Sequence, residues 1–149
     1  MEGEVDRVKT MQSAVVPSKS MSGVEINNWL SEFARAVRAA DYDAGRRMFA
    51  QEVVSFGTIN EILDGRDQLE TRQWRNVWSV TRGFDFDYTS VRNHVQADHA
   101  WAVALWSSEG RNQTGWFARQ GRATFVFEKR DGRWLAVHSH LSLVPPPTV

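Results

Sequence analysis

The stretch FEKRDGRWLAVHSHLS, residues 127–142, decides how the second half of this 149-residue chain folds. Its Asp131-Gly132 pair is a typical two-residue connection between antiparallel strands, because both residue types tolerate the positive φ that a tight hairpin requires. Strand-forming side chains lead up to this pair, and a second run of them, residues 134–144, follows it. We therefore expect the last two strands of the chain to form a hairpin here.

Residues upstream of this hairpin alternate with the period of two that marks a strand with one buried face. In residues 84–88 aromatic side chains alternate with aspartates, and in residues 100–106 apolar side chains of different size alternate. Strand character resumes over residues 116–127, after a turn around residues 109–112. The sequence thus predicts a four-stranded antiparallel meander over residues 84–144.

The first half of the chain carries helical signals instead. Ser22 and Glu25 form a capping box before apolar side chains at helical spacing, which predicts a helix over residues 23–40. Asp43 is the expected cap of a short second helix that reaches Ala50.

A third helix is expected to begin at a capping box formed by Asp67 and Glu70 and to end near Val80. Short strands are expected at residues 53–56 and 59–63. Helices followed by strands predict an α+β fold, in which the helices pack on one face of a curved, mainly antiparallel sheet.

Length and composition indicate a single folded domain. Residues 1–22 are polar and are interpreted as an N-terminal arm or tail, residues 23–144 as the domain, and residues 145–149 as a proline-rich exit. The N-terminus lacks the apolar segment of a signal peptide, and no apolar run is long enough to span a membrane. We therefore expect a cytoplasmic protein that does not associate with membranes.

Charge and motifs argue against several classes of function. Eighteen basic residues balance eighteen acidic ones, which speaks against nucleic acid as a partner because such domains are usually basic. Cysteine is absent, so thiolate chemistry, disulfides and cysteine-bound metals are excluded. Glycine-rich phosphate-binding loops and the H-E-x-x-H zinc motif are absent as well, and we expect neither a metal nor another cofactor.

The final hairpin also carries a resemblance to a known family. R-D-G-R-W followed by V-H-S-H-L-S resembles the R-R-D-G-K-W and V-H-x-H-x-S of the association domain of calcium/calmodulin-dependent protein kinases. Asp41, Met48, Phe56 and the run Val77-Trp78-Ser79 fit the same pattern. The chain is thereby similar to the SnoaL-like branch of the nuclear transport factor 2-like superfamily. The resemblance implies a cystatin-like cone of helices closed by a bent sheet, a fold that hosts enzymes, binding modules and oligomerisation hubs.

The resemblance also implies that a ligand would lie inside the cone. Steroid isomerases of the superfamily have acidic residues at positions where this chain has Ser55 and Thr124 or its neighbours. The kinase association domains have arginines at three positions where this chain has Trp106, Phe125 and Leu141. An aromatic and aliphatic pocket prefers an uncharged, mostly apolar small molecule. The residues expected to line this ligand-binding pocket are Trp74, Trp78, Trp106, Phe125 and Leu141.

Two other functions stay open at this point. If side chains fill the cone completely, the domain serves as an oligomerisation or interaction module. If the pocket holds an acid–base group, the protein is an isomerase-, cyclase- or dehydratase-like enzyme, with Glu70, Tyr88 or His94 as the candidate group. Glu70 is followed at helical spacing by Trp74 and Trp78, and indoles beside a carboxyl group would raise its pKa. The alternative for Glu70 is an exposed charge at the start of the helix.

A second set of side chains is expected on the outer face of the sheet, where alternation places large apolar residues. A monomer rarely leaves so large an apolar patch in water, so we expect a homodimer that buries it. The parity of the last strand puts Ala136 and Ser142 on this face too. The expected interface contains Trp101, Val103, Leu105, His138 and His140. The two histidines lack a third ligand and are not expected to bind a metal.

Overall fold

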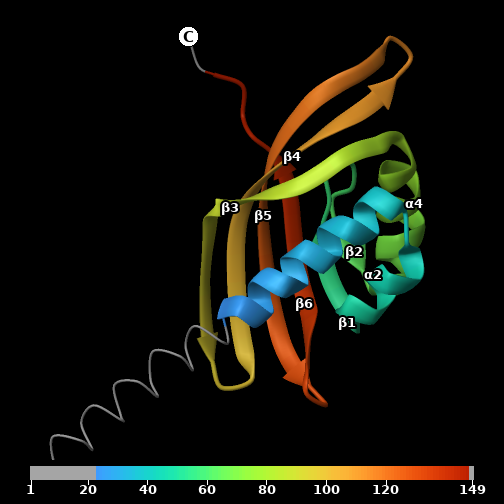
Figure 1. Ribbon diagram of the computed structural model, residues 1–149. Coiled ribbons are helices and arrows are strands. Elements are labelled where there is room, and N and C mark those ends of the chain that lie inside the picture. Colours follow the sequence, from blue (N-terminus) through green and yellow to red (C-terminus); the bar gives the residue numbers. More distant parts are fainter. Residues whose placement is uncertain (1–22, 148–149) are drawn as a thin grey trace, which may run out of the picture.

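The computed structural model describes residues 23–147, which form a single sheet covered on one face by helices (Figure 1). A helix over residues 23–39 crosses the sheet, and shorter helices lie beside it near β1 (Figure 1). No helix in this part of the chain combines the length and the apolar character needed to cross a membrane. The other elements are α2 (Tyr42–Met48), β1 (Phe49–Phe56), β2 (Leu63–Asp64), α3 (Arg66–Gln68), a π-helical segment (Leu69–Trp74), α4 (Arg75–Val77), a 3-10 turn (Trp78–Val80), β3 (Thr81–Gln96), β4 (His99–Asn112), β5 (Gly115–Arg130) and β6 (Arg133–Leu143).

The strands lie in the order β2-β1-β6-β5-β4-β3. β3, β4, β5 and β6 form the predicted antiparallel meander. β1 joins the sheet through parallel pairing with β6, and β2 adds a short antiparallel bridge at its far edge. The predicted α+β class, with helices on one face of a mainly antiparallel sheet, is confirmed.

The hairpin between β5 and β6 forms at the predicted pair. Asp131 has a φ of 52° and Gly132 a φ of 77°. Two positive φ angles in succession define the type I′ turn, whose twist matches that of the strands it joins. This turn fixes the register of β5 on β6, with Arg130 opposite Arg133.

Two predicted helix starts are wrong in detail. The cap of α2 is Asp41 rather than Asp43, because the Asp41 carboxylate accepts a hydrogen bond from the Ala44 amide at 3.1 Å. The third helical region begins after Gly65 without a side-chain cap. Glu70 does not complete a capping box, since its carboxylate turns toward two arginines instead.

The predicted strand over residues 59–63 shrinks to the bridge Leu63–Asp64. Leu63 is fully buried, whereas Ile59 and Ile62 are exposed, so the segment follows the surface and reaches the core only at its end. The turn expected at residues 109–112 lies slightly later, because β4 continues to Asn112. The Asn112 side chain then accepts hydrogen bonds from the Thr114 amide and hydroxyl and closes the loop.

A β-bulge in β6 places Ala136 on the opposite face of the sheet from the one predicted. Phe127 pairs with Ala136 but Val126 pairs with His138, so Val137 is the extra residue. The bulge shifts the alternation by one. Ala136 is therefore fully buried, on the inner side of the sheet, rather than on the outer face with the histidines.

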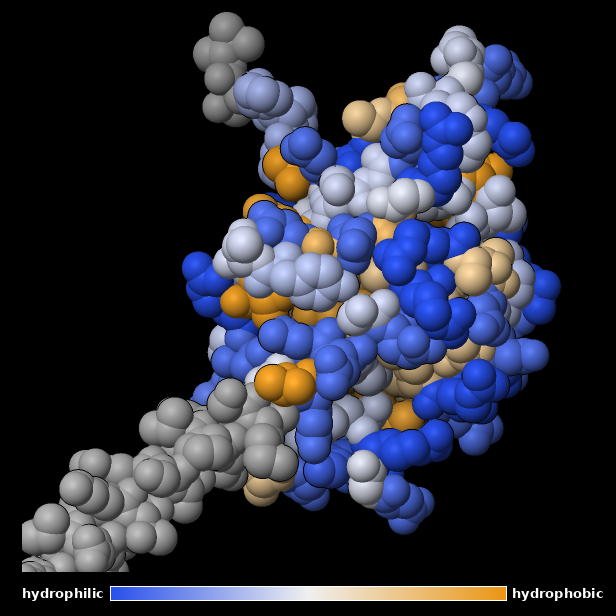
Figure 2. All heavy atoms as spheres, in the orientation of Figure 1, coloured by the Kyte–Doolittle hydropathy of each residue, from blue (hydrophilic) through white to orange (hydrophobic). Residues whose placement is uncertain are grey.

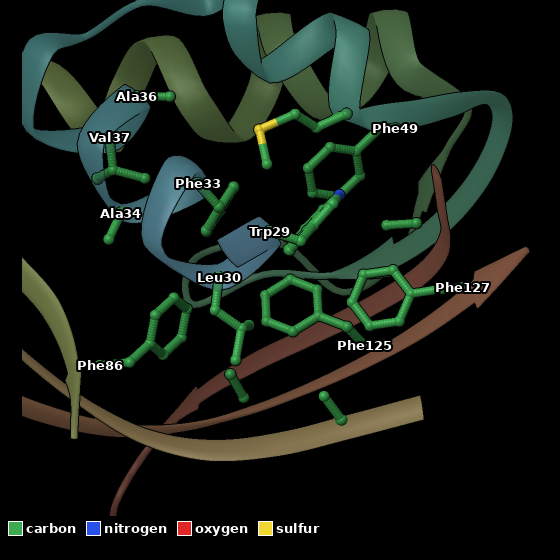
Figure 3. Packing of buried hydrophobic residues seen from close by; sticks show 14 of the residues in the cluster. Trp29, Leu30, Phe33, Ala34, Ala36, Val37, Phe49, Phe86, Phe125 and Phe127 are labelled. Atoms are coloured by element: carbon green, nitrogen blue, oxygen red, sulfur yellow. The ribbon is translucent and has the colours of Figure 1, made fainter. Parts of the chain in front are cut away.

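Aromatic rings fill the space between the first helix and the sheet (Figure 3). Trp29 stacks on Phe33 one helical turn away, and its ring edge meets Phe125 and Phe127 of β5 at centroid distances of 5.0 and 4.8 Å. Phe49, at the start of β1, closes the cluster at 5.5 Å from Trp29. This end of the cone is packed solid.

Trp106 defines the other end of the interior because it lies flat across β5. Gly121 is its cross-strand partner, and a Cβ at Gly121 would lie 2.1 Å from the indole. The indole Nε1 donates to the Arg122 carbonyl at 3.2 Å. The absent side chain of Gly121 therefore sets the position of Trp106.

We predict that Gly121→Ala lowers the free energy of unfolding by about 1–3 kcal/mol, because the added methyl group overlaps both the indole of Trp106 and a backbone oxygen of β6. Urea denaturation followed by circular dichroism measures the change. Gln120→Ala, at the adjacent exposed position of β5, is the control and should change little. Equal stability of Gly121→Ala and the control would contradict the prediction.

Candidate functional site

A cavity lies between the helical segment after Gly65 and the inner face of the sheet. The space that the centre of a water molecule can reach there measures about 50 Å³, which is room for a few waters. Its walls are mainly carbon. The large apolar side chains of the lining include Trp74, Trp78, Phe84, Trp106 and Leu141.

The helical segment supplies one wall through two stacked indoles. The rings of Trp74 and Trp78 lie 4.6 Å apart and nearly parallel. The backbone of α2 comes close to them at Gly45, where a Cβ would lie 2.8 Å from one indole and 2.9 Å from the other. Trp74 and its buried neighbour Gln73 belong to the π-helical segment, a rare winding that often marks functional sites.

The opposite wall continues along β4 and β5 and changes character from apolar to polar. Trp106 pairs with Gly121, and the next inward pair is Ser108 with Arg119. Side chains directly opposite each other on one face lie close together, so Ser108 and Arg119 form one polar patch. The Arg119 guanidinium also lies above the Trp106 ring, 5.7 Å from its centroid.

Thr58 and Gln73 complete the polar end of the cavity. The Thr58 hydroxyl accepts from Gln73 Nε2 at 3.1 Å and from Arg119 Nη2 at 3.3 Å. The other end of the Gln73 amide accepts from Asn60 at 2.9 Å. The amide orientation of Gln73 is thus fixed, and the side chain packs against Gly57, which has no Cβ to obstruct it.

Two polar groups at this end are not fully satisfied by residues 23–147. Ser108 Oγ is buried and has no hydrogen-bond partner among them. Arg119 makes no ion pair with a carboxylate in the same part of the chain, and burial lowers the pKa of its guanidinium. Buried polar groups are normally hydrogen-bonded, so this patch is suited to receive an acceptor from a ligand.

A second pair of hydroxyl groups lies deeper, where β1 meets β6. Ser55 Oγ and Ser139 Oγ are 2.7 Å apart and buried. Each satisfies the other, and Ser139 also lines the cavity. The floor of the cavity is thus polar but internally paired.

Comparison with known proteins agrees with this architecture. Residues 26–147 match the SnoaL-like domain. The chain belongs to the SnoaL-like domain family. The match covers the first helix from Ile26 onward, all later helices, the sheet and every residue of the cavity.

Solved structures of the nuclear transport factor 2-like superfamily and of cystatin-like proteins share the fold of this SnoaL-like protein. A superfamily protein from Salmonella enterica shares the fold with a TM-score of 0.76 at 19% identity, over 87% of this chain and 96% of the other. A Xanthomonas campestris protein, provisionally described as a calcium/calmodulin dependent protein kinase II association domain, gives 0.66 at 22% identity, over 84% and 86%. A cystatin-like protein from Caulobacter vibrioides gives 0.69 at 17% identity, over 83% and 90%. These similarities establish the fold that the resemblance of the final hairpin implies.

One curated relative is the F-box protein SKIP8 of Arabidopsis thaliana, which is 28% identical over 118 residues. The aligned region is 76% of this chain and 47% of the relative, so the SnoaL-like protein spans less than half of that protein's length.

The cavity brings together four of the five residues predicted to bind a ligand: Trp74, Trp78, Trp106 and Leu141. Phe125 lies elsewhere, fully buried in the aromatic cluster around Trp29. The alternation along the strands correctly placed Phe125 on the inner face of the sheet. It did not show whether an inward side chain lies in the aromatic cluster or lines the cavity. The polar residues Thr58, Gln73, Ser108 and Arg119 were not predicted, although Ser108 and Arg119 share the inward parity of Trp106 and Phe125.

Glu70 is buried rather than an exposed charge at a helix start, and the raised pKa considered for it is wrong. Burial of the carboxyl group favours the neutral form, yet hydrogen bonds from Arg75 and Arg46 outweigh it, so the pKa of Glu70 lies below its usual value. The carboxylate oxygens lie 2.7 Å from Arg75 Nη2 and 3.0 Å from Arg46 Nη1. Glu70 is a structural anion that links α2 to the helical segment, and it does not line the cavity.

The other two acid–base candidates lie on β3, away from the cavity. The Tyr88 hydroxyl donates to Asp85 at 3.0 Å, and partial burial together with that carboxylate raises the pKa of Tyr88. His94 is exposed and stacks on Trp101. Neither side chain faces the cavity.

The outer face of the sheet carries the residues predicted for an interface. Trp101 is 43% and Leu105 47% exposed. His138 Nδ1 lies 2.8 Å from the Val54 carbonyl, and the Phe56 ring meets both His138 and His140 edge-on. The histidines thus pack against β1 from the outer side.

We predict that Glu70→Gln lowers the free energy of unfolding by about 1–2 kcal/mol at pH 7, because two charge-assisted hydrogen bonds to partly exposed arginines are weakened. The folded-state pKa of Glu70 is lowered, so its contribution is complete above the unfolded-state pKa of about 4.3 and is lost as the pH falls through the lower folded-state value. The difference between wild type and variant should therefore shrink below pH 4.

Urea denaturation at several pH values provides the measurement. Glu109→Gln is the matched control, because Glu109 pairs with Arg82 on an exposed part of the sheet. The control should cost less than about 0.5 kcal/mol. A Glu70→Gln effect that stays constant from pH 7 to pH 3 would refute the assignment.

Proposed function

We propose that this SnoaL-like protein binds a small molecule whose body is mostly apolar, in the cavity bounded by Trp74, Trp78, Trp106 and Leu141. The observation that carries the proposal is a carbon-walled cavity with an unsatisfied polar patch at one end. Apolar walls with a few convergent polar groups are typical of small-molecule sites. Burying apolar surface of the ligand would contribute about 25 cal/mol per Å².

The composition of the lining favours binding over catalysis. Among the described residues around the cavity, Arg119 is the one charged side chain, and no aspartate, glutamate or histidine reaches it. General acid–base catalysis requires a group with a suitable pKa within hydrogen-bond reach of the substrate. An arginine remains protonated at neutral pH and is unsuited to that role, so the enzyme alternative lacks its central residue within residues 23–147.

The filled-cone alternative accounts for only half of the interior. The rings of Trp29, Phe125 and Phe127 pack against one another and do not line the cavity. Beyond Phe84, whose ring lies 5.4 Å from that of Trp106, the packing opens into the cavity. The solid half supports the fold and leaves the other half for binding.

We predict that Leu141→Phe abolishes ligand binding while preserving the fold, because the larger side chain fills the cavity. Titration of the protein with butan-1-ol and cyclohexanol, followed by tryptophan fluorescence, measures binding through Trp74, Trp78 and Trp106. Leu143→Phe is the control, because Leu143 lies on the same strand but is exposed. Failure of wild type to respond to either alcohol, or an undiminished response from Leu141→Phe, would overturn the proposal.

We propose in addition that the protein forms a homodimer through the outer face of its sheet. The visible helical side is largely hydrophilic with scattered apolar residues (Figure 2). The outer sheet face instead exposes large apolar side chains, which include Val54, Phe56, Trp101 and Leu105. An isologous contact between two copies would remove this surface from water.

We predict that Val103→Asp converts the dimer into a monomer, because burying a carboxylate without a partner in the contact costs on the order of several kcal/mol. Light scattering at micromolar concentration measures the change. Val24→Asp, which places the same charge on the exposed side of the first helix, should leave the dimer intact. A monomeric wild type at that concentration would rule out the dimer.

A further inference from the structure

We propose that the ligand is a small monocarboxylic acid whose carboxylate is held by the Arg119 guanidinium and the Ser108 and Thr58 hydroxyls. The inference rests on the proposed small-molecule function and specifies its ligand class. It replaces the uncharged ligand expected from the sequence, because the structure brings a cation to the end of an otherwise apolar cavity.

Within residues 23–147, two half-buried arginines lack a counter-charge, Arg66 and Arg119. Arg66 lies outside the cavity and donates to the Arg46 and Phe49 carbonyls, so Arg119 is the one of the two that lines the cavity. Arg46 is paired with both Asp67 and Glu70, at 2.9 and 3.0 Å. Arg130 is paired with Glu52 and Glu128. Within residues 23–147, the Arg119 guanidinium donates to one side chain, the Thr58 hydroxyl, and lies over the face of the Trp106 indole. A half-buried guanidinium without an anion costs stability, and a carboxylate from outside the protein would supply the missing partner.

The hydrogen-bond pattern around Arg119 presents donors. Thr58 Oγ1 already accepts from Gln73 and Arg119, so its own hydrogen is directed to a third group. Ser108 Oγ, buried opposite Arg119 in the β4–β5 register, has no partner in the described residues and is free to donate. Two hydroxyl donors beside a guanidinium match the two oxygens of a carboxylate, which accept hydrogen bonds and donate none.

The residues around Arg119 also determine the charge of the ligand and the polarity of the chain attached to its carboxylate. The single unpaired charge fits a monoanion better than a phosphate dianion. Beyond the polar patch, the ligand meets Trp106 and Leu141, and the Trp106 Nε1 is already engaged by the Arg122 carbonyl. Trp106 therefore offers its ring face rather than a donor. A short apolar chain attached to the carboxylate fits this arrangement, whereas a polar chain would leave its own groups unsatisfied.

The position of this cation is particular to this chain. The resemblance to the kinase association domains implies arginines at the positions of Trp106, Phe125 and Leu141, and Arg119 is at none of them. Arg119 is one inward position beyond Gly121 on β5, so its side chain approaches the cavity from the Ser108 end.

Isothermal titration calorimetry with three probes of nearly equal shape tests the inference: butanoate, butanamide and butan-1-amine. Wild type should bind butanoate at least 10-fold more tightly than butanamide, and butan-1-amine not at all. Arg119→Gln should lose the preference for butanoate while it retains the weak binding of butanamide. Arg122→Gln, whose side chain is exposed on the opposite face of β5, is the matched control and should behave as wild type.

A stability measurement separates a binding role of Arg119 from a structural one. Arg119→Met removes a desolvated charge without breaking an ion pair, so its urea midpoint should equal or exceed that of wild type. Loss of butanoate binding together with an unchanged or raised midpoint supports the inference. A lowered midpoint would instead show that Arg119 serves the fold, and would overturn the inference.

The outcomes also separate this inference from the proposed function. Equal binding of butanoate and butanamide, unaffected by Arg119→Gln, would reject the carboxylate and leave the apolar pocket standing. Absence of binding for all three probes and for the alcohols would reject both. A preference for butanoate that persists in Arg119→Gln would place the anion elsewhere in the molecule and overturn the assignment to Arg119.

Discussion

The edge-on packing of Trp29 against two phenylalanines of β5 is the contact on which the rest of the structure depends. It anchors the first helix to the centre of the sheet, since Phe125 and Phe127 lie on a strand with neighbours on both sides. Because these rings fill one end of the cone, the remaining interior is confined to the other end. There the walls come from the short helical segment and from Trp106, and a small space is left over. The solid half therefore determines where the hollow half lies.

Most of the fold could be predicted from local sequence signals. Asp131 and Gly132 determine a turn by their own backbone preferences, and the alternating residues before and after them determine which face of each strand is buried. The first helix follows from its apolar spacing. Such features depend on neighbours in the chain, so a single sequence contains the information. The prediction of a strand at residues 59–63 was wrong because a strand also needs a surface to pack against. Of the apolar side chains in this segment, Leu63 reaches the core, whereas Ile59 and Ile62 are exposed.

The candidate site was predicted only for its apolar part, and the reason is physical. Inward parity and helical spacing place Trp74, Trp78, Trp106 and Leu141 in the interior whatever their partners are. The roles of Glu70 and Arg119 depend instead on which charges the tertiary fold brings within 3 to 4 Å. Glu70 meets two arginines and becomes a structural anion. Arg119 meets no carboxylate in the described part of the chain, although its place one inward step from Gly121 could have been read from the same alternation.

The contrast between these two residues explains how a chain with no net charge can recognise an anion. Neutrality is an average over eighteen basic and eighteen acidic residues, and it says nothing about individual pairs. Glu70 is a buried anion whose two cationic partners belong to the protein, so the ion pairs offset the cost of removing its carboxylate from water. Arg119 lies beside a buried hydroxyl that is also unpartnered, and the protein supplies no anion for it among the described residues. A charge that the fold does not neutralise is a cost to stability, and natural proteins retain such costs chiefly where function needs them. The location of the unpaired charge, at the polar end of the cavity, is therefore the strongest indication of what the cavity binds.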